Sequence, residues 1–244
     1  MGQALAQGLN ALAQITVAAL VDVHEPRESY GARYHELLTG VEPSGVDAVV
    51  DFSNPEGVVV SAAWCAEHGI GLVIGATGLS AEQRGAVEAA GAKTGVVMAS
   101  NFSIGAVLSE RFAAMAAPYF EGVEIIELHH DKKVDAPSGT SLAAARRIGA
   151  ARKNAGMAPL VDPTVRHTVA GARGADAGDG VMIHSVRLPG LVAHQEILFG
   201  GPGEGLTIRH DSYDRQSFVQ GVALAVLAVS STPGLTTGID SFIA

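Results

Sequence analysis

The stretch Val46-Asp47-Ala48-Val49-Val50-Asp51-Phe52-Ser53-Asn54-Pro55 holds the pattern that decides the fold. A short β-branched run ends in small polar residues, and Asn54-Pro55 then offers a helix cap with proline in the first turn. The same succession of strand, polar turn and helical pattern recurs at residues 72–78 and 96–103. Three such units in a row are typical of a parallel sheet with crossover helices, so the sequence predicts an α/β fold.

Polar residues follow these strands at positions where ligands bind in such folds. A further strand is predicted at residues 15–20, just before Asp22. The carboxyl ends of parallel strands meet at one edge of an open sheet, and ligands gather there. Asp22, Ser53, residues 75–78 and Asn101 all occupy such positions, so they are candidates for ligand binding.

The pattern changes after about residue 122. Longer strands with few helices between them are predicted at residues 181–188, 192–199 and 206–210, which indicates a second, α+β domain with a mixed or antiparallel sheet. The helical run at residues 217–229 is predicted to return and cover the first domain. Its predicted apolar face consists of Phe218, Val222, Ala225, Val226 and Val229.

The composition limits the possible partners and locations. The 244 residues are 48% hydrophobic and 17% charged, which describes a globular protein with a sizeable core. A formal charge of −9 and the lack of any lysine or arginine run argue against nucleic acid or an anionic membrane surface as partner. The single cysteine, Cys65, cannot form an internal disulfide and is expected to be a buried hydrophobe, which favours a reducing cytoplasm. No long apolar segment or signal-like start is present, so export is not expected.

The first residues depart from the usual opening of a dinucleotide-binding fold. Such a fold starts with a strand and a glycine-rich turn whose amides hold a pyrophosphate. Here Met1-Gly2 leads directly into a helical pattern over residues 4–12. We therefore expect the first strand and most of the phosphate loop to lie upstream of residue 1, with Gly2 as the last glycine of that turn.

The densest polar cluster is ELHHDKKVDAPSGT, residues 127–140. A strand is predicted before it and a helix after it, so the cluster lies on a connecting loop, where catalytic residues are common. His129 and His130 are adjacent and point to opposite faces of an extended segment, which makes them poor partners in one metal site. Histidine suits proton transfer because its unperturbed pKa is about 6.5, and the alternative is a histidine that only packs locally. Neither His-Glu-x-x-His spacing nor a Cys/His array is present, so no metal is predicted.

The second half of the cluster favours an anionic ligand. Lys133 can stabilise developing negative charge, whereas Lys132 is expected to point to the opposite face if the segment is extended, so that one of the two lysines is only solvated. Ser138 can cap the following helix, and the amides of Gly139 and Thr140 can then hold a carboxylate or phosphate. An ordinary helix cap without a ligand explains the same residues equally well. Ser138 is not expected to be a nucleophile, because no G-x-S-x-G elbow surrounds it.

Asp22 and two turns of the first domain are candidates for binding a dinucleotide. Asp22 is placed to accept hydrogen bonds from ribose hydroxyls. The turns comprise Gly75, Ala76, Thr77 and Gly78, and Ala99, Ser100, Asn101 and Phe102. Each of these features also occurs in plain turns after a strand.

Taken together, the motifs resemble the dihydrodipicolinate reductase family, now called 4-hydroxy-tetrahydrodipicolinate reductase, over most of the chain. The most specific match is residues 127–130 with Lys133 and residues 135–140. The supporting matches are Asp51-Phe52-Ser53, Gly75-Ala76-Thr77-Gly78, Asn101-Phe102-Ser103-Ile104-Gly105, Gly171-Ala172-Arg173-Gly174 and Thr207-Ile208-Arg209-His210-Asp211-Ser212.

The resemblance implies a Rossmann-like dinucleotide-binding domain at residues 1–102 and 214–244, and a substrate-binding and oligomerisation domain at residues 103–213. It implies a cytoplasmic homotetramer that reduces 4-hydroxy-tetrahydrodipicolinate to tetrahydrodipicolinate in lysine and diaminopimelate biosynthesis. NADH or NADPH is the implied reductant, and Asp22 without an arginine directly after it favours NADH. The implied steps are loss of water, hydride transfer to ring carbon C4 and protonation of the resulting enamine.

The resemblance also implies a role for each site residue. His129 would donate or accept a proton, and Lys133 would be the second catalytic proton donor. The substrate's carboxylates would be held by His130, Gly139 and Thr140, with Ser138 capping their helix. Cofactor contacts are implied for Gly75, Ala76, Thr77, Ala99, Ser100, Asn101 and Phe102, with Asp22 on the ribose.

Two alternative functions are compatible with the same residues. One is a non-catalytic, oligomeric dicarboxylate-binding protein that lacks working dinucleotide binding. The other is a related reductase of another small acid. Dicarboxylate binding without NADH binding would identify the first, and a panel of substrates would identify the second.

Overall fold

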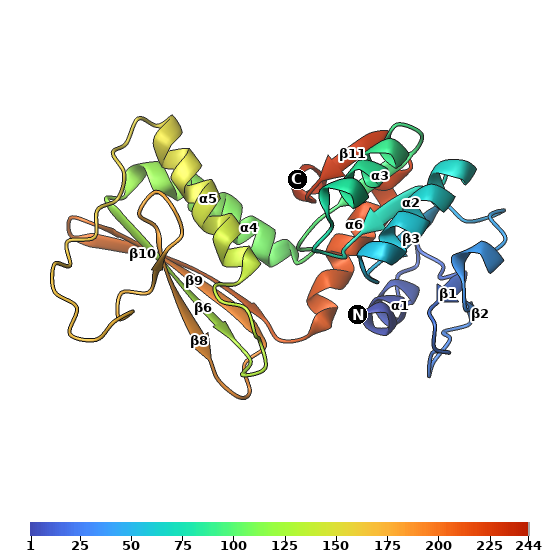
Figure 1. The fold of residues 1–244 in the computed structure, drawn as a ribbon, viewed down its shortest axis with the longest axis horizontal. Helices are drawn as coiled ribbons and strands as arrows, with labels where there is room; N and C mark the ends of the chain where they lie inside the picture. Colours follow the sequence, from blue (N-terminus) through green and yellow to red (C-terminus); the bar gives the residue numbers. More distant parts are fainter. Residues whose placement is uncertain (244) are drawn as a thin grey trace. The chain divides into compact units, whose positions relative to one another are not determined.

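The computed structural model describes residues 1–243, which form two compact units. Unit 1 combines Met1–Ile104 with the segment that starts at Arg215, and unit 2 is Gly105–Asp214. Unit 1 contains a parallel sheet, and unit 2 contains a mixed sheet with helices packed against it (Figure 1). These features confirm the predicted fold class, an α/β protein with a parallel-sheet domain and a second domain that has a mixed sheet.

The four-stranded parallel sheet of unit 1 has the strand order β11-β5-β4-β3. Its strands are β3 Ala48–Asp51, β4 Gly71–Ile74, β5 Gly95–Met98 and β11 Gly234–Thr237. Every residue of β4 and β5 is buried, as expected for central strands that are covered on both faces. The sequence does not predict β11, because four residues with one large apolar side chain carry little strand signal.

Helices α2 Pro55–His68 and α3 Ala81–Gly91 cover one face of this sheet. Asn54 caps α2 as predicted, because its Oδ1 accepts a hydrogen bond from the amide of Gly57 at 2.9 Å. Cys65 on α2 is fully buried, and burial raises the pKa of its thiol to about 12. The prediction that Cys65 packs as a small hydrophobe is therefore confirmed.

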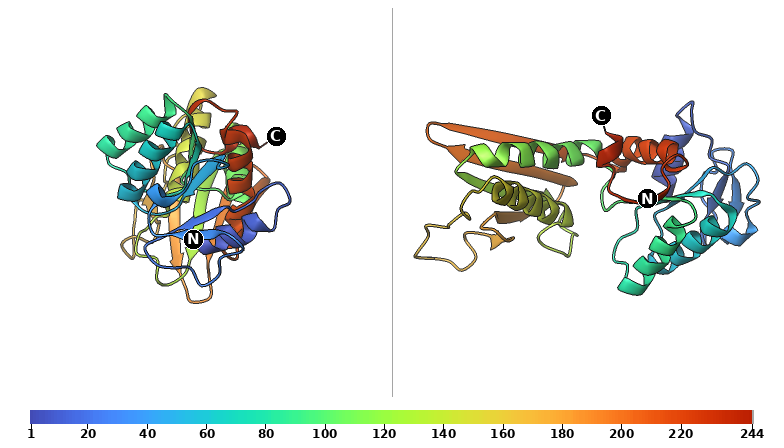
Figure 2. Two further views of the ribbon diagram at one scale, coloured as in Figure 1. Left: turned by 90° about the vertical axis from the view of Figure 1, so that its right-hand side faces the viewer. Right: turned by 90° about the horizontal axis from the view of Figure 1, so that it is seen from above.

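Helix α6, Val219–Val229, contacts β3, β4 and β5. It returns to unit 1 as predicted, and Figure 2 shows it on the side of the sheet opposite α2 and α3. Val222, Ala225 and Val229 of the predicted apolar face are buried. Helix α1, Gly2–Asn10, packs against α6, so the C-terminal helix joins both the sheet and the first helix of the chain.

Gly221 on α6 is packed so closely against the rest of unit 1 that no side chain fits. A Cβ atom at this position would lie 1.9 Å from the carbonyl oxygen of Phe102. We expect Gly221→Ala to lower the free energy of unfolding of unit 1 by about 1–3 kcal/mol, because the helix must shift away from the backbone that it contacts. Denaturant unfolding followed by the fluorescence of Trp64 measures this change, since Trp64 is the only tryptophan and belongs to unit 1.

Gly85→Ala on α3 is the matched control. A Cβ atom at Gly85 meets no atom within 4 Å, and alanine is favoured over glycine inside a helix. This variant should therefore gain about 0.5–1 kcal/mol of unfolding free energy. Equal unfolding midpoints for the two variants would contradict the close packing of α6.

Strands β1 Ala19–Val21 and β2 Arg33–His35 form a separate two-stranded parallel sheet. The predicted strand at residues 15–20 is therefore wrong for residues 15–18, although Asp22 follows the observed strand as predicted. Within residues 1–243, β1 does not pair with the four-stranded sheet. Asp22 consequently belongs to a different sheet from the polar residues that follow β3, β4 and β5.

The five-stranded sheet of unit 2 has the order β10-β9-β6-β8-β7. Its β6 and β8 pair in parallel and its other neighbours are antiparallel, so the predicted mixed sheet is confirmed. The strands are β6 Gly122–His129, β7 Ala175–Asp176, β8 Met182–Arg187, β9 Ala193–Gly201 and β10 Glu204–Ser212. The helices are α4 Ile104–Ala116 and α5 Gly139–Asn154, and Figure 1 shows them alongside each other. Short 3-10 helices are η1 Leu38–Gly40, η2 Ala117–Tyr119, η3 Arg215–Phe218 and η4 Asp240–Phe242.

Helices α4 and α5 pack against one face of this sheet. Val123, Ile125 and Ile197 lie on the face that is buried against α4 and α5. Alternate side chains of a strand point to opposite faces, so Ile126 and Leu198 lie on the other face, where they are half-buried. We call the first face the helix-covered face and the second the open face.

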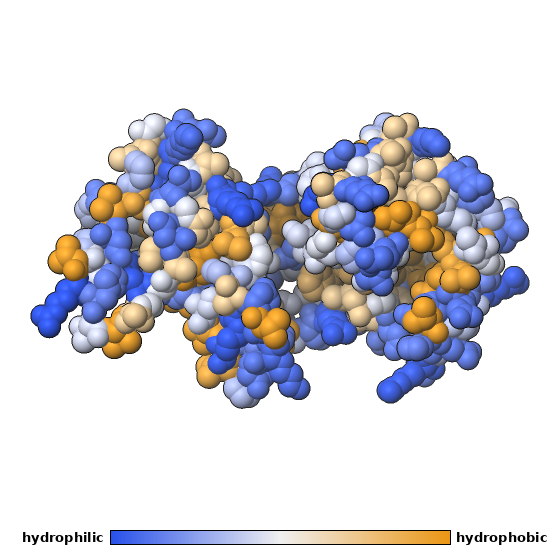
Figure 3. All heavy atoms as spheres, in the orientation of Figure 1, coloured by the Kyte–Doolittle hydropathy of each residue, from blue (hydrophilic) through white to orange (hydrophobic). Residues whose placement is uncertain are grey.

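Figure 3 shows hydrophobic residues distributed among hydrophilic ones on the viewed surface of each unit. No helix within residues 1–243 is both long enough and apolar enough to cross a membrane. In the same part of the chain, no three His, Cys, Asp or Glu side chains group as a metal site.

Candidate active site

A row of polar residues crosses the helix-covered face of unit 2 near the end of β6. Strand register places Glu127 of β6 between Ser185 of β8 and Gln195 of β9. His210 of β10 continues the row beyond Gln195. Apolar residues fill the same face further along the strands, so the polar side chains gather at one end of it.

Glu127 lies within this row, and its side chain is completely buried. Each of its carboxylate oxygens accepts a hydrogen bond from Arg187 at 2.8 Å. Its Oε2 also contacts Nδ1 of His129 at 2.5 Å, and its Oε1 accepts the amide N–H of Ser138 at 3.3 Å. Burial raises the pKa of Glu127, but the hydrogen bonds that it accepts, above all from Arg187, outweigh burial, and the pKa lies below its ordinary value. Glu127 is therefore an ionised carboxylate that fixes its neighbours in place.

His129 is the last residue of β6 and shares a face with Glu127, two residues earlier. Desolvation by burial lowers the pKa of His129, and the contact with Glu127 only partly opposes this, so the ring is neutral at neutral pH. A neutral ring whose Nδ1 faces a carboxylate carries its proton there, which leaves Nε2 as an acceptor. His129 can thus take up a proton at Nε2 while Glu127 stabilises the resulting positive charge.

The segment after β6 is a turn rather than the extended chain considered from the sequence. The amide of Lys133 donates a hydrogen bond to the carbonyl of His130 at 3.2 Å, which closes the turn. Lys132 is exposed, whereas Lys133 is half-buried, so Lys132 is the solvated member of the pair. The turn, and not strand alternation, separates the two lysine side chains. His130 is exposed directly after the strand.

Lys133 is linked to His129 by a continuous series of contacts. Its ammonium group pairs with the carboxylate oxygens of Asp135 at 2.7 and 2.8 Å, and this hydrogen bonding lowers the pKa of Asp135. The carbonyl of Asp135 accepts a hydrogen bond from Arg187 at 2.8 Å. Because Arg187 also binds Glu127, the structure brings both predicted catalytic residues to one end of the sheet.

Helix α5 begins beside this cluster. Ser138 occupies the N-cap position as predicted, but its side chain makes no capping hydrogen bond. The predicted side-chain cap is therefore wrong, because Ser138 is buried with its amide N–H directed to Glu127. A Cβ atom on Gly139 would meet no atom within 4 Å, so space is open at the first turn. Thr140 follows and is half-buried, and first-turn amides, which lack carbonyl partners within a helix, favour an anion.

Glu127 and Arg187 have no assigned role in the sequence prediction. Glu127 carries a usable signal, since it lies two residues before His129 on a predicted strand and must share its face. Arg187 carries none, because it is 60 residues from Glu127 in sequence and only the register of β6 with β8 brings them together.

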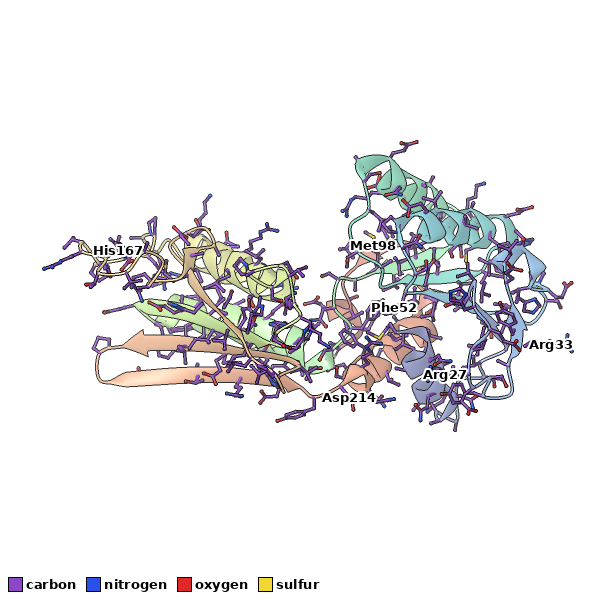
Figure 4. The ribbon with its side chains drawn as sticks, turned by 60° about the horizontal axis from the view of Figure 1, so that its bottom comes forward. Arg27, Arg33, Phe52, Met98, His167 and Asp214 are labelled. Atoms are coloured by element: carbon purple, nitrogen blue, oxygen red, sulfur yellow. The ribbon has the colours of Figure 1, made fainter. Side chains whose placement is uncertain are left out.

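In unit 1 the predicted dinucleotide-binding turns follow β4 and β5. A Cβ atom on Gly75 would lie 2.2 Å from the ring of Phe52, which is labelled in Figure 4, so only glycine lets the ring cover this turn. The amide of Gly75 donates to the carbonyl of Asp51 at 2.8 Å. The amide of Ala99 donates to the carbonyl of Ile74 at 3.0 Å. Both turns are therefore anchored to the neighbouring strand.

The predicted cofactor residues differ in exposure. Ala99 and Phe102 are buried, and the ring of Phe102 packs against Phe52 with their centres 5.4 Å apart. The accessible members are Gly75, Ala76, Thr77, Ser100 and Asn101. Asp22 is exposed after β1, and its Oδ1 accepts the amide N–H of His24 at 3.1 Å. Among the predicted cofactor residues, the accessible turns and the exposed carboxylate are therefore the parts that a ligand can reach.

Family models match both parts of the chain. Residues 1–102 match the model described as dihydrodipicolinate reductase, N-terminus, and residues 105–243 match the model described as dihydrodipicolinate reductase, C-terminus. A 4-hydroxy-tetrahydrodipicolinate reductase from Nocardia farcinica is 47% identical over 246 residues, which cover 100% of this chain and 94% of that protein. Another from Streptomyces griseus is 50% identical over 211 residues, which cover 85% of this chain and 84% of that protein.

A solved structure is similar over nearly the whole chain. It is the dipicolinate-bound dihydrodipicolinate reductase from Paenisporosarcina sp. TG-14, with 38% sequence identity and a TM-score of 0.85. The match covers 98% of this chain and 94% of that one. An amine dehydrogenase from Mycobacterium smegmatis, with 13% identity and a TM-score of 0.57, shares the fold alone.

Proposed function

The chain belongs to the dihydrodipicolinate reductase family. From this premise we propose which residues bind the two ligands and which residues transfer protons. The protein is an NAD(P)H-dependent 4-hydroxy-tetrahydrodipicolinate reductase of lysine and diaminopimelate biosynthesis. Residues 1–102 and 214–244 bind the dinucleotide, and residues 103–213 bind the substrate and form the oligomer. This division is supported by the two compact units, whose boundaries lie after Ile104 and after Asp214.

The residues of unit 1 fit a reduced pyridine nucleotide, which when bound supplies the hydride added to ring carbon C4. The turns after β4 and β5 lie where open parallel sheets bind ligands, and Gly75 lets the backbone come close beneath Phe52. Asp22 accepts the ribose hydroxyls and, without a following arginine, disfavours a 2′-phosphate, so NADH is preferred. The other residues that hold the nucleotide are Gly75, Ala76, Thr77, Ala99, Ser100, Asn101 and Phe102, the buried ones through their backbone.

Asp22→Ala should change the preference between the two nucleotides. We expect the KM for NADH to rise about tenfold, because an acceptor for the ribose hydroxyls is lost. The KM for NADPH should not rise, because the charge that opposes its 2′-phosphate is lost as well. Steady-state kinetics with both nucleotides measures this, and Glu67→Ala, at an exposed acidic residue near the end of α2, should change neither constant. An equal rise of both constants would refute the role of Asp22.

His129 transfers a proton through Nε2. Loss of water from the substrate requires removal of a proton from the ring carbon beside the imine and departure of hydroxide from C4. The neutral ring of His129 accepts that proton, and Glu127 stabilises the charged ring until the proton returns to the enamine. The 2.5 Å contact between His129 and Glu127 is the observation that carries this role, because it leaves Nε2 available.

Lys133 protonates the departing hydroxide. Hydrogen bonds to both oxygens of Asp135 hold the ammonium group, which has three N–H donors and so keeps one for the substrate. Its positive charge also stabilises negative charge that develops on the ring. Asp135 positions Lys133 without touching the reacting atoms.

The first turn of α5 holds the substrate's carboxylates, through Gly139 and Thr140 with His130 beside them. Ser138 positions the helix by its bond to Glu127. We expect Gly139→Ala to weaken binding of dipicolinate, used as probe, by about tenfold while unfolding is unchanged, since its methyl group enters space that no protein atom occupies. Titration calorimetry measures binding, and Gly200→Ala on β9, where a Cβ atom also meets nothing within 4 Å, is the control. Unchanged affinity in Gly139→Ala would place the carboxylates elsewhere.

The chain assembles as a homotetramer in the cytoplasm in this proposal. The half-buried Ile126 and Leu198 on the open face support association through unit 2, because burial of these two side chains against a second copy would gain free energy. Light scattering should give four times the chain mass of 24.9 kDa. A monomeric mass with full activity would refute the assembly.

The reaction itself is tested by NADH oxidation with the 244-residue chain and substrate generated in the assay from pyruvate and aspartate semialdehyde. Turnover that requires both precursors supports the assigned roles. Folded protein that binds dipicolinate but shows neither turnover nor NADH binding would instead support a non-catalytic dicarboxylate-binding protein.

A further inference from the structure

Gln195 on β9 carries an unexplained polar atom. Its side-chain Nε2 is buried and has no hydrogen-bond partner among residues 1–243. The residue is only 5% exposed, so bulk water does not satisfy this donor. A buried amide N–H that makes no hydrogen bond destabilises a folded protein, and such groups in native structures call for an explanation.

The position of Gln195 points to the first turn of α5. Its Oε1 accepts a hydrogen bond from Oγ of Ser141 at 2.6 Å, and Ser141 is the third residue of that helix. The amide group is planar, so Nε2 lies next to Oε1, close to the start of α5. Strand register also places Glu127 and His210 directly beside Gln195 on the same face of the sheet.

The neighbouring carboxylate of Glu127 does not accept a hydrogen bond from Nε2 of Gln195. Glu127 already receives hydrogen bonds from Arg187, the contact of His129 and the amide of Ser138. Since the hydroxyl of Ser141 donates to Oε1, the remaining Nε2 group of Gln195 is a donor. A free donor close to the amides of a helix N-terminus suits an anionic acceptor.

We propose that Gln195 is a substrate-binding residue whose Nε2–H donates to a carboxylate oxygen of the dicarboxylate at the first turn of α5. This inference rests on the proposed function, because it deepens the description of the same site. It also gives Gln195 a part in specificity. A ligand without a carboxylate at this point leaves the donor unpaired and binds more weakly.

Gln195→Met removes both amide atoms while keeping a side chain of similar size. We expect the Kd for dipicolinate, measured by titration calorimetry on the full chain, to rise about 10- to 100-fold. The KM for the substrate should rise with it, whereas the KM for NADH should not change. A fall in kcat of less than about threefold would separate binding from proton transfer.

Two further variants separate binding from folding. Ser141→Ala removes the partner of Oε1 but keeps Nε2, so it should lower the melting temperature and change the Kd for dipicolinate by no more than a few-fold. The double variant Gln195→Met with Ser141→Ala removes the whole contact. It should melt closer to the wild type than Ser141→Ala does and still show the full loss of dipicolinate affinity.

The outcomes separate this inference from the proposed function. Wild-type affinity in Gln195→Met, together with weakened binding in Gly139→Ala, would overturn the role of Gln195 alone and assign its donor to a buried water. No dipicolinate binding by the wild type would overturn both. A loss in Gln195→Met that Ser141→Ala reproduces in full would show that the contact only supports the helix.

Discussion

We expect His129→Ala to lower the turnover of this reductase by about 10²- to 10⁴-fold, the usual contribution of a positioned general acid or base. In the proposed mechanism the variant loses the Nε2 atom that accepts and returns the ring proton, while Glu127 keeps Arg187 as its partner and the sheet should stay folded. Lys133→Ala should lose turnover in the same range, because in the proposed mechanism Lys133 protonates the departing hydroxide. NADH oxidation at saturating substrate measures both effects.

The chain offers a matched control for each variant. His167→Ala changes an exposed histidine, labelled in Figure 4, in the segment between α5 and β7. Lys132→Ala changes the exposed lysine next to Lys133. Both controls should turn over like the wild type. Near-normal turnover in His129→Ala and Lys133→Ala would remove the assigned roles.

Glu127→Ala is expected to destabilise unit 2 by about 3 kcal/mol, the lower end of the range for breaking a buried ion pair. The lower end applies because Arg187 is partly exposed and can be hydrated again once its partner is gone. The amide of Ser138 also loses its acceptor. Hydrogen exchange of the β6 and β9 amides measures the loss within unit 2. The activity should fall too, since His129 loses the group that fixes its Nδ1 proton.

The pH dependence of stability follows from the same carboxylate. The pKa of Glu127 is lowered in the folded chain, so the unfolded chain binds the proton first as the pH falls below about 4.3. The stabilisation is therefore fully present above that pH and is lost as the pH falls through the lower folded-state pKa. The lowered pKa of His129 acts in the same direction below about pH 6.5.

Glu127→Gln isolates the contribution of this carboxylate because it keeps the shape of the side chain. Melting temperatures of unit 2 between about pH 3 and pH 7 should fall less steeply toward acid in this variant than in the wild type. Parallel curves for the two proteins would show that Glu127 contributes nothing to the acid response.

Local sequence signals predicted much of this fold and part of the site. Asn54-Pro55 marks the start of α2 because a helix cap bonds to an amide only a few residues further along the chain. His129 and Lys133 are close in sequence, and the segment that holds them is bounded by a recognisable strand and helix. These features depend on interactions within a few residues, which is why a single sequence displays them.

The missed features depend on distant pairing. Arg187 reaches Glu127 through the register of β6 with β8, over a separation of 60 residues. Gln195 reaches Ser141, 54 residues away, because α5 packs against the sheet. Likewise β11 is a strand because β5 offers it an edge, and not because of its own pattern. The side chain of Ser138 does not cap its helix, since the backbone amide of Ser138 is held by a hydrogen bond to Glu127, which is distant in sequence.

The chain order of unit 1 has a consequence for biosynthesis. Unit 2 is continuous, whereas unit 1 needs α6 and β11 from the last segment to cover one face of its sheet and to extend its edge. Translation proceeds at about 5–20 residues per second, so a ribosome completes unit 2 seconds before it supplies β11. We therefore expect unit 2 to be able to fold before unit 1, the reverse of the usual order in which the N-terminal domain folds first. A chain arrested at Asp214 would contain all of unit 2, whereas the sheet of unit 1 would lack α6 on one face and β11 at its edge. We expect chaperones to be most needed at this stage.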